Sequence, residues 1–347
     1  MASPSLQHKR HRNVLTDVVR IYIETGEPVS SRSIARRHPE PLSSATVRNV
    51  MADLEEEGFL YQPHTSAGRV PTASAYRFFV EEVAAQATPR PQDLDWIRRE
   101  LATAATPEAV MERASRILAD VSRGLGIVIS PPFAQTLVEH LRFLVIPDNR
   151  VLVVLIGSGG VTRDKVLRPE RTFRQDELDH IADYLNHHYS GWTLEAIRAD
   201  LQAQLAKDRE RYDRLASDAL MLCDADLLGD DGTRRVYVEG AAQLATSPEF
   251  ADQAQLRDLL ATIEERSRLV SLLTGFVEAP EPVHVELGVK EIPAAGRHLA
   301  IVTAPFMSGE QRQGTVGILG PMRMHYERVI TAVAFMAEFF SEDTKKN

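Results

Sequence analysis

The sequence predicts an α+β protein built from more than one domain. The first eighty residues hold three amphipathic helical patterns followed by a short hairpin pattern. Residues 140–168 hold three apolar runs separated by turn residues, which is typical of an antiparallel meander. Beyond residue 235, strand patterns alternate with two helical patterns. With 347 residues, the chain is long enough for two or three domains.

Composition and cysteine usage favour a soluble protein from a reducing compartment. Apolar residues make up 44% of the chain and charged residues 26%, which is ordinary for packed domains. The single cysteine, Cys223, excludes a disulfide within one chain. The N-terminal stretch lacks the apolar segment of a signal peptide, and the longest apolar run, 151–156, is far below the ~20 residues that span a bilayer. We therefore expect a cytoplasmic protein.

Charge is distributed unevenly along the chain. Residues 1–80 contain ten Lys and Arg residues and eight Asp and Glu residues, a net charge of +2. Because the whole chain carries −9, the remainder carries −11. A mildly basic head on an acidic body fits a head that contacts a polyanion such as nucleic acid, although an ordinary surface fits equally well.

Capping and breaking residues divide the first sixty residues into three helices. The first pattern covers 12–25 and ends at Gly26. The second covers 31–38 and is stopped by the prolines that follow it. Ser43 is placed to cap the third helix, and Gly58 follows its end as a C-terminal glycine.

The third helix has one apolar face and one polar face. Arg48 and Asn49 project away from the apolar face in the first turns, beside the small Ala45 and with Thr46 at the flank. A helix that reads base edges uses its N-terminal residues in this way. Arg48 suits guanine or phosphate, and Asn49 suits adenine. The apolar face consists of Val47, Val50, Met51 and Leu54.

A hairpin is expected directly after this helix. Residues 59–61 form a strand pattern, 62–68 a turn-rich loop and 69–70 a possible return strand, with Thr72 placed to cap the next helix. This arrangement is a winged helix-turn-helix, whose wing lies along DNA, and the segment 58–80 contains no acid. The alternative is a three-helix bundle whose hairpin makes protein contacts. The candidate DNA-binding residues are Ser44, Ala45, Thr46, Arg48, Asn49, His64, Thr65, Ser66 and Arg69.

Three runs in this region carry a resemblance to a known family. They are GEPVSS at 26–31, ATVRN at 45–49 and PHTSAGR at 63–69. On these runs the sequence resembles the HrcA family, the heat-inducible transcription repressors of bacteria, and a weaker similarity extends to the C-terminus. Ala75 departs from the family pattern, which has glycine there, and this departure concerns the geometry at the start of the helix.

The resemblance implies a dimeric repressor of chaperone operons. Its partners would be double-stranded DNA with an inverted-repeat operator, a second copy of the chain, and the GroE chaperonin that helps to keep the repressor active. It also implies a winged-helix head at 1–85, followed at 86–134 by linker helices and the first part of a GAF-like α/β domain. A dimerising domain of three antiparallel strands plus helices would be inserted at 135–228, and 229–347 would complete the GAF-like domain. The residue pattern alone also allows three consecutive domains.

The rest of the chain supplies further expected elements. A linker is expected at 84–92, and Thr106 is placed to cap the helix after it. The dimer contact is expected in the inserted region, on its three strands and on the helical stripe from Leu194 to Leu215. The expected helices are 93–103, 107–123, 175–188, 193–222, 249–273 and 326–341. The expected strands are 126–130, 141–146, 151–156, 161–167, 236–238, 283–287, 299–304 and 315–319.

Other candidate sites fit plain structural roles better. The glycines at 157–160 lack the lysine and helix of a phosphate loop and suit a hairpin turn. His187 and His188 are adjacent and point in different directions, and the acidic loop at 224–231 lacks calcium-loop spacing. Cys223 fits a small buried thiol. We expect no enzyme, cofactor or metal. The main rival is a winged-helix repressor whose GAF-like domain senses a small metabolite.

Overall fold

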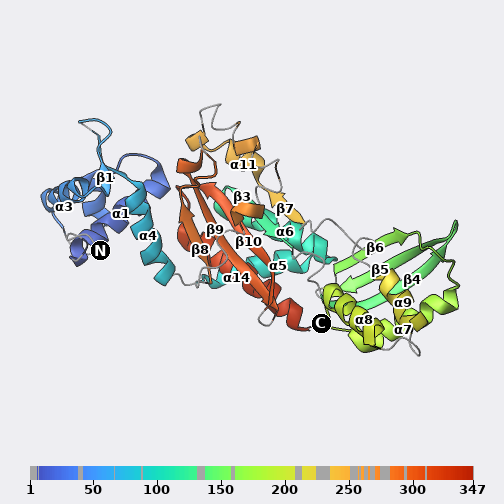
Figure 1. Cartoon of the computed structure of the whole chain (residues 1–347). Coiled ribbons are helices and arrows are strands. Elements are labelled where there is room, and N and C mark those ends of the chain that lie inside the picture. Colours follow the sequence, from blue (N-terminus) through green and yellow to red (C-terminus); the bar gives the residue numbers. More distant parts are fainter. Residues whose placement is uncertain are drawn as a thin grey trace.

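The computed structural model describes residues 6–346 apart from residue 7 and the segments 38–41, 66, 87–88, 131–136, 158–160, 208–212, 224–234, 251–256, 258, 262–264, 266–269, 274–281, 293–294 and 309–310. The protein is α+β, as predicted, and its sheets are antiparallel. Figure 1 shows three parts, which we call the head (8–86), the body (89–130 and 235–346) and the outer module (137–223).

The head consists of four helices and a two-stranded hairpin (Figure 1). The first helix ends at Gly26, whose φ of 71° is left-handed, so the glycine stop is confirmed. The Ser43 hydroxyl accepts a hydrogen bond of 3.0 Å from the Thr46 amide, which confirms the predicted cap. Thr72 instead donates its hydroxyl to the carbonyls of Gly58 and Phe59. The elements are α1 (Lys9–Thr25), α2 (Ser31–Arg37), α3 (Ser44–Glu56), β1 (Leu60–Tyr61), β2 (Val70–Pro71) and α4 (Ala73–Gln86).

The body is a five-stranded antiparallel sheet of order β7-β3-β10-β9-β8. Its elements are α5 (Pro91–Ala102), α6 (Pro107–Ser122), β3 (Leu125–Ile129), β7 (Val236–Glu239), α11 (Ala241–Ala245), β8 (His284–Leu287), β9 (Leu299–Ser308), β10 (Gln311–Pro321) and α14 (Tyr326–Lys346), with short 3₁₀ turns at Pro248–Phe250 and Gly296–His298. The Thr106 hydroxyl caps α6, as predicted. The helices α6 and α14 cover one face, where Val302 and Val316 are buried, and Ile301 and Leu319 belong to the core of the other face. β3 therefore pairs with strands that come more than a hundred residues later.

Two parts of the body differ from what the sequence predicts. The helix α11 was not predicted, because five residues are too few for a clear helical period. The predicted helix at 249–273 falls largely outside the described residues. Its described parts are the 3₁₀ turn at Pro248–Phe250 and helical residues at 257, 259–261 and 270–273, separated by the non-helical residue 265.

The outer module combines a three-stranded meander with three helices. The predicted meander is confirmed, with β5 in the middle and antiparallel pairing on both sides. The module has a hydrophobic core of its own, built from one face of the sheet and from the helices. Its elements are β4 (Val138–Ile146), β5 (Arg150–Gly157), β6 (Val161–Leu167), α7 (Gln175–Tyr189), α8 (Leu194–Lys207) and α9 (Asp213–Leu222).

The predicted single helix at 193–222 is wrong. The described residues form two helices, α8 and α9, which lie against each other. A straight helix of that length would carry Ala219 and Leu222 away from the module, whereas both are fully buried in its core. The stripe that begins at Leu194 is likewise buried inside the module, with Ile197 and Leu201 fully covered. It is therefore not a free surface for dimer contact.

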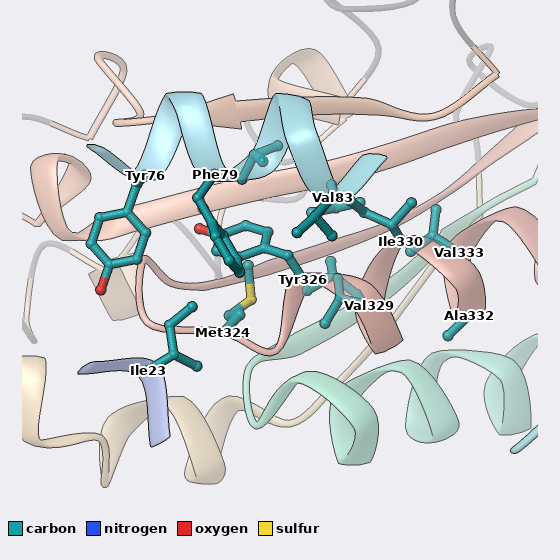
Figure 2. Packing of buried hydrophobic residues seen from close by; sticks show 14 of the residues in the cluster. Ile23, Tyr76, Phe79, Val83, Met324, Tyr326, Val329, Ile330, Ala332 and Val333 are labelled. Carbon is teal, nitrogen blue, oxygen red and sulfur yellow. The ribbon is translucent and has the colours of Figure 1, made fainter. Parts of the chain in front are cut away.

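The head and the body share one hydrophobic core. Figure 2 shows Tyr76, Phe79 and Val83 of α4 against Tyr326 and Val329 of α14. The head therefore has apolar surface outside its own helices, because one face of α4 packs on α14, a helix that lies far away in the sequence. No helix in the described ranges has the length and apolar character needed to cross a membrane.

Polar contacts accompany this apolar joint. The guanidinium of Arg323 lies so close to Gly26 that a β-carbon there would be 2.2 Å from its Nη1. The same side chain donates from Nε to Glu249 Oε1 over 2.7 Å. Burial alone would raise the pKa of Glu249, but hydrogen bonds from Ser247 and Arg323 hold that pKa below its ordinary value. Arg323 thus lies between the end of α1 and Glu249 of the body.

Candidate nucleic-acid interface

The α3 helix presents its first turns to solvent, as predicted. Ala45, Arg48 and Asn49 are exposed and Thr46 is partly exposed. The opposite face is anchored in the core, where Val47 and Leu54 are fully buried and Val50 and Met51 are nearly so. Because the helix is fixed along this apolar face, its polar face is held outward in one orientation.

The helix α2 is joined to α3 at their first residues. The hydroxyl oxygens of Ser31 and Ser44 are hydrogen-bonded over 3.0 Å. The two helices also pack against each other. Ser44 is therefore engaged in a helix–helix contact and is only partly exposed. Thr46 is likewise only partly exposed, and its hydroxyl is hydrogen-bonded to that of Ser43 over 2.8 Å.

The two strands of the hairpin pair at the base of its loop. Leu60 pairs with Pro71 and Tyr61 with Val70, so the strands are short and the loop spans eight residues. His64 and Thr65 are exposed in this loop, while Ser66 lies outside the described residues. The structure therefore brings an exposed loop carrying His64 and Thr65 into the same head as the exposed α3 face.

Gln62 organises the hairpin loop and was not among the predicted residues. Its side-chain amide donates to the carbonyl of Thr65 over 3.0 Å and to the carbonyl of Ala67 over 2.8 Å. One side chain thus satisfies two loop carbonyls and folds the loop back toward β1. A glutamine at the first loop position is the signal that sequence reasoning passed over.

Arg69 does not extend freely from the hairpin. Its Nη2 atom lies 2.7 Å from Glu55 Oε2, and the two side chains are only 19% and 33% exposed. Its backbone forms a bridge to Val29, with both N–H groups donating over 2.8 Å. The sequence predicted the cation but not its partner. This pair also accounts for an acid near the C-terminal end of α3, where the helix dipole disfavours negative charge.

The remaining candidate sites lie only partly within the described residues. No group of three or more His, Cys, Asp or Glu side chains that could hold a metal ion occurs among them. Burial raises the pKa of the Cys223 thiol to about 12, as expected of an inert buried cysteine. His187 and His188 are exposed. The loop residues 158–160 and the acidic residues at 224–231 lie outside the part that the structure describes.

A helical head with an exposed polar helix, joined to a larger α+β body, fits the class of transcription regulators. The model of the HrcA protein C-terminal domain matches residues 108–330. The heat-inducible transcription repressor HrcA of Geobacter sulfurreducens is 36% identical over 334 residues, covering 96% of this chain and 97% of that protein. The repressor of the same name from Syntrophobacter fumaroxidans is 34% identical over 338 residues, with 96% of each chain covered. The chain therefore belongs to the HrcA family of heat-inducible transcription repressors.

A solved structure supports the fold. A crystal structure described only as a hypothetical protein, at 2.2 Å resolution, superposes with a TM-score of 0.64. Its sequence is 23% identical, and the match covers 98% of this chain and 99% of that one. The three-part arrangement is thus shared by another protein over nearly the full length.

Proposed function

We propose that the protein represses heat-shock chaperone operons by binding, as a dimer, to an inverted-repeat operator. The observation that carries this proposal is the exposed N-terminal face of α3, where Arg48 and Asn49 stand on a helix fixed by a buried apolar face. Membership of a family of heat-inducible repressors supports the same role. No catalytic role is proposed, because the relatives are named as repressors.

The head would act as a winged helix-turn-helix. In this arrangement α2 and α3 form the helix pair, α3 enters the major groove, and the β1–β2 hairpin is the wing. Arg48 would contact guanine or phosphate and Asn49 adenine, since these side chains match the acceptors and donors of those base edges. The proposed contact residues are Ser44, Ala45, Thr46, Arg48 and Asn49 on α3, and His64, Thr65 and Ser66 in the wing.

The body and the outer module would correspond to a GAF-like domain with an insertion. β3 lies inside the body sheet, between the edge strand β7 and the central strand β10, although the outer module separates it from both in sequence. The outer module has its own core, with none of its buried residues in the body clusters. Both observations favour an insertion at 135–228 over three consecutive domains.

The outer module would supply the dimer contact through the open face of its sheet. Leu144, Leu152 and Val166 stand in one cross-strand row, because Leu144 pairs with Leu152 and Leu152 with Val166. Leu144 and Val166 are 40% and 46% exposed, while the neighbouring Val153 and Phe143 point into the core. An exposed apolar row on a flat sheet is the kind of surface that monomers bury on association.

Regulation would come from the GroE chaperonin rather than from a metabolite. A cleft of about 510 Å³ lies between the head helices α1 and α4 and the body helices α5 and α14. Its charges balance, with an ion pair of 2.9 Å between Arg20 and Glu327 and one of 3.3 Å between Arg328 and Asp93. Four of the six charged side chains that line the cleft are thus paired with one another, so the cleft does not favour a charged metabolite.

Footprinting on chaperone promoters tests the proposal. The full-length protein should protect two half-sites related by two-fold symmetry, and Arg48→Ala should weaken this protection. Added chaperonin should increase the fraction of protein that binds. Uniform protection of random DNA, or protection of a single half-site by a monomer, would contradict the operator and dimer parts of the proposal. Equal binding with and without chaperonin would contradict only the regulatory part.

A further inference from the structure

Arg69 is attached to the rest of the head at two points. Its guanidinium contacts Glu55 in the last turn of α3 at 2.7 Å. Its main chain exchanges two hydrogen bonds of 2.8 Å with Val29, in the connection between α1 and α2. Residue 69 therefore links the returning arm of the hairpin to both ends of the α2–α3 pair.

The close approach at this point requires glycine beside Arg69. A β-carbon on Gly68 would lie 2.4 Å from the carbonyl oxygen of Val29 and 2.6 Å from that of Pro28. Both neighbours are backbone atoms, which cannot move aside without displacing the α1–α2 connection. The arm is thus seated directly on that connection, and only a residue without a side chain fits there.

The guanidinium of Arg69 already has an ion-pair partner within the head. Its side chain is 19% exposed, and its Nε atom is buried without a hydrogen-bond partner among the described residues. Little of this guanidinium is exposed to a phosphate, and its Nη2 atom is held in an ion pair with a partly buried carboxylate. Removing it would also leave the Glu55 carboxylate unpaired in a head that binds a polyanion.

We propose that Arg69 is a positioning residue, which through Glu55 sets the hairpin relative to the base-reading face of α3, and that it does not contact DNA itself. This inference rests on the proposed function, since it concerns the geometry of the DNA-binding head. Arg69 holds the end of α3 and the arm of the hairpin together, so that His64 and Thr65 reach the duplex while Arg48 and Asn49 are in the groove.

A salt series of operator binding distinguishes the two roles. We would measure operator affinity of the full-length protein by fluorescence anisotropy at several salt concentrations. Arg48→Ala is the matched control, because Arg48 is an exposed arginine of the same head. If Arg48 contacts phosphate, Arg48→Ala makes the plot of log affinity against log salt less steep, by about one unit of slope for each head. Arg69→Ala should weaken operator binding but leave this slope at the wild-type value.

Charge reversal provides the second measurement. Glu55→Arg and Arg69→Glu should each weaken binding, and the double variant should recover most of the affinity because the ion pair is re-formed with opposite polarity. Hydroxyl-radical footprints of Arg69→Ala should lose the protection due to the hairpin and keep that due to α3. Thermal unfolding of each variant identifies any that fails to fold, and Glu55→Gln then serves in place of Arg69→Ala.

Two results would overturn the inference. One is a drop in salt slope for Arg69→Ala equal to that for the Arg48 control. The other is a double reversal that binds no better than the weaker single variant. Failure of the proposed function would look different, because the wild-type protein would then show no preference for operator over random DNA.

Discussion

The ring of Tyr326 lies edge-on to the ring of Phe79, with centroids 6.5 Å apart, and this contact joins the last helix of the chain to the fourth. Tyr76, which is also on α4, lies at the same centroid distance from Tyr326. The Tyr326 side chain is fully buried, and its hydroxyl donates to the carbonyl of Met322 over 2.8 Å. The head is therefore held on the body by an aromatic cluster as well as by the ion pair between Arg20 and Glu327.

Replacing Tyr326 tests how firmly the head is held. Tyr326→Ala should lower the free energy of unfolding by about 3–5 kcal/mol, because a large buried ring is lost and a cavity remains. Tyr326→Phe should cost only about 0.5–1.5 kcal/mol, the worth of the hydrogen bond to Met322. Denaturant unfolding measures both, and Tyr61→Ala is the control because that ring is 48% exposed. A loss below 1 kcal/mol for the alanine variant would mean that the head is only loosely attached.

Asn49→Ala should weaken operator binding by about 1–3 kcal/mol and leave binding to random DNA nearly unchanged. The reason is that an amide on the exposed face of α3 can pair with adenine, whereas it adds nothing to phosphate attraction. Competition titrations with operator and random duplexes measure the two affinities side by side. Equal losses on both duplexes would show that Asn49 only positions the backbone.

Leu152→Glu should convert a dimer into a monomer at micromolar concentrations. The carboxylate would stand between Leu144 and Val166, in the middle of the exposed apolar row, where burial of an unpaired charge is costly. Sedimentation equilibrium measures the mass directly. His187→Glu is the control, since His187 is exposed on α7, on the helical side of the module. A dimer that survives Leu152→Glu would move the two-fold axis to another part of the chain.

Cys223 should report on the opening of the outer module. Its thiol is 1% exposed, and burial raises its pKa from an ordinary 9.0 to about 12. Below about pH 9 the thiol is neutral in both the folded and the unfolded chain, and the contribution of Cys223 to the free energy of unfolding is fully present. As the pH rises from 9 toward 12 the thiol of the unfolded chain ionises first, so this contribution is lost. At pH 8 a thiol reagent should modify Cys223 slowly in the native protein and rapidly in denaturant. Leu178→Ala, which removes a fully buried neighbour in the same core, should speed the native reaction.

Local signals explain why much of the fold was predictable. Gly26, Ser43 and Thr106 act within four residues of themselves, and each ends or caps a helix as its residue type predicts. The apolar runs of the outer module also predicted their strands, because alternate residues face one core. The length of the helix at 193–222 was not predictable, since charged residues such as those at 207–211 favour helix and only tertiary packing shows where the chain folds back.

The sequence predicted which side chains of α3 are exposed, but it did not predict the contacts between residues of the site. A helical wheel is enough to place Arg48 and Asn49 opposite the core. The pairing of Arg69 with Glu55 depends on how a hairpin folds back on a helix end, and the loop bonds of Gln62 depend on the same path. The contact between the head and the body was not predicted for a related reason. The sequence shows the apolar face of α4, but it does not show that this face packs on α14.

The packing of α4 on α14 sets an order of events during synthesis. Phe79 leaves the ribosome long before Tyr326 exists, and β3 is made long before its neighbour β10. At about 5–20 residues per second, the growing chain exposes the aromatic face of α4 for roughly 10–50 s. A head on a nascent or truncated chain that stops before Tyr326 therefore lacks the α14 surface on which α4 packs. Chains interrupted before Tyr326 would therefore carry heads that cannot make this contact with the body.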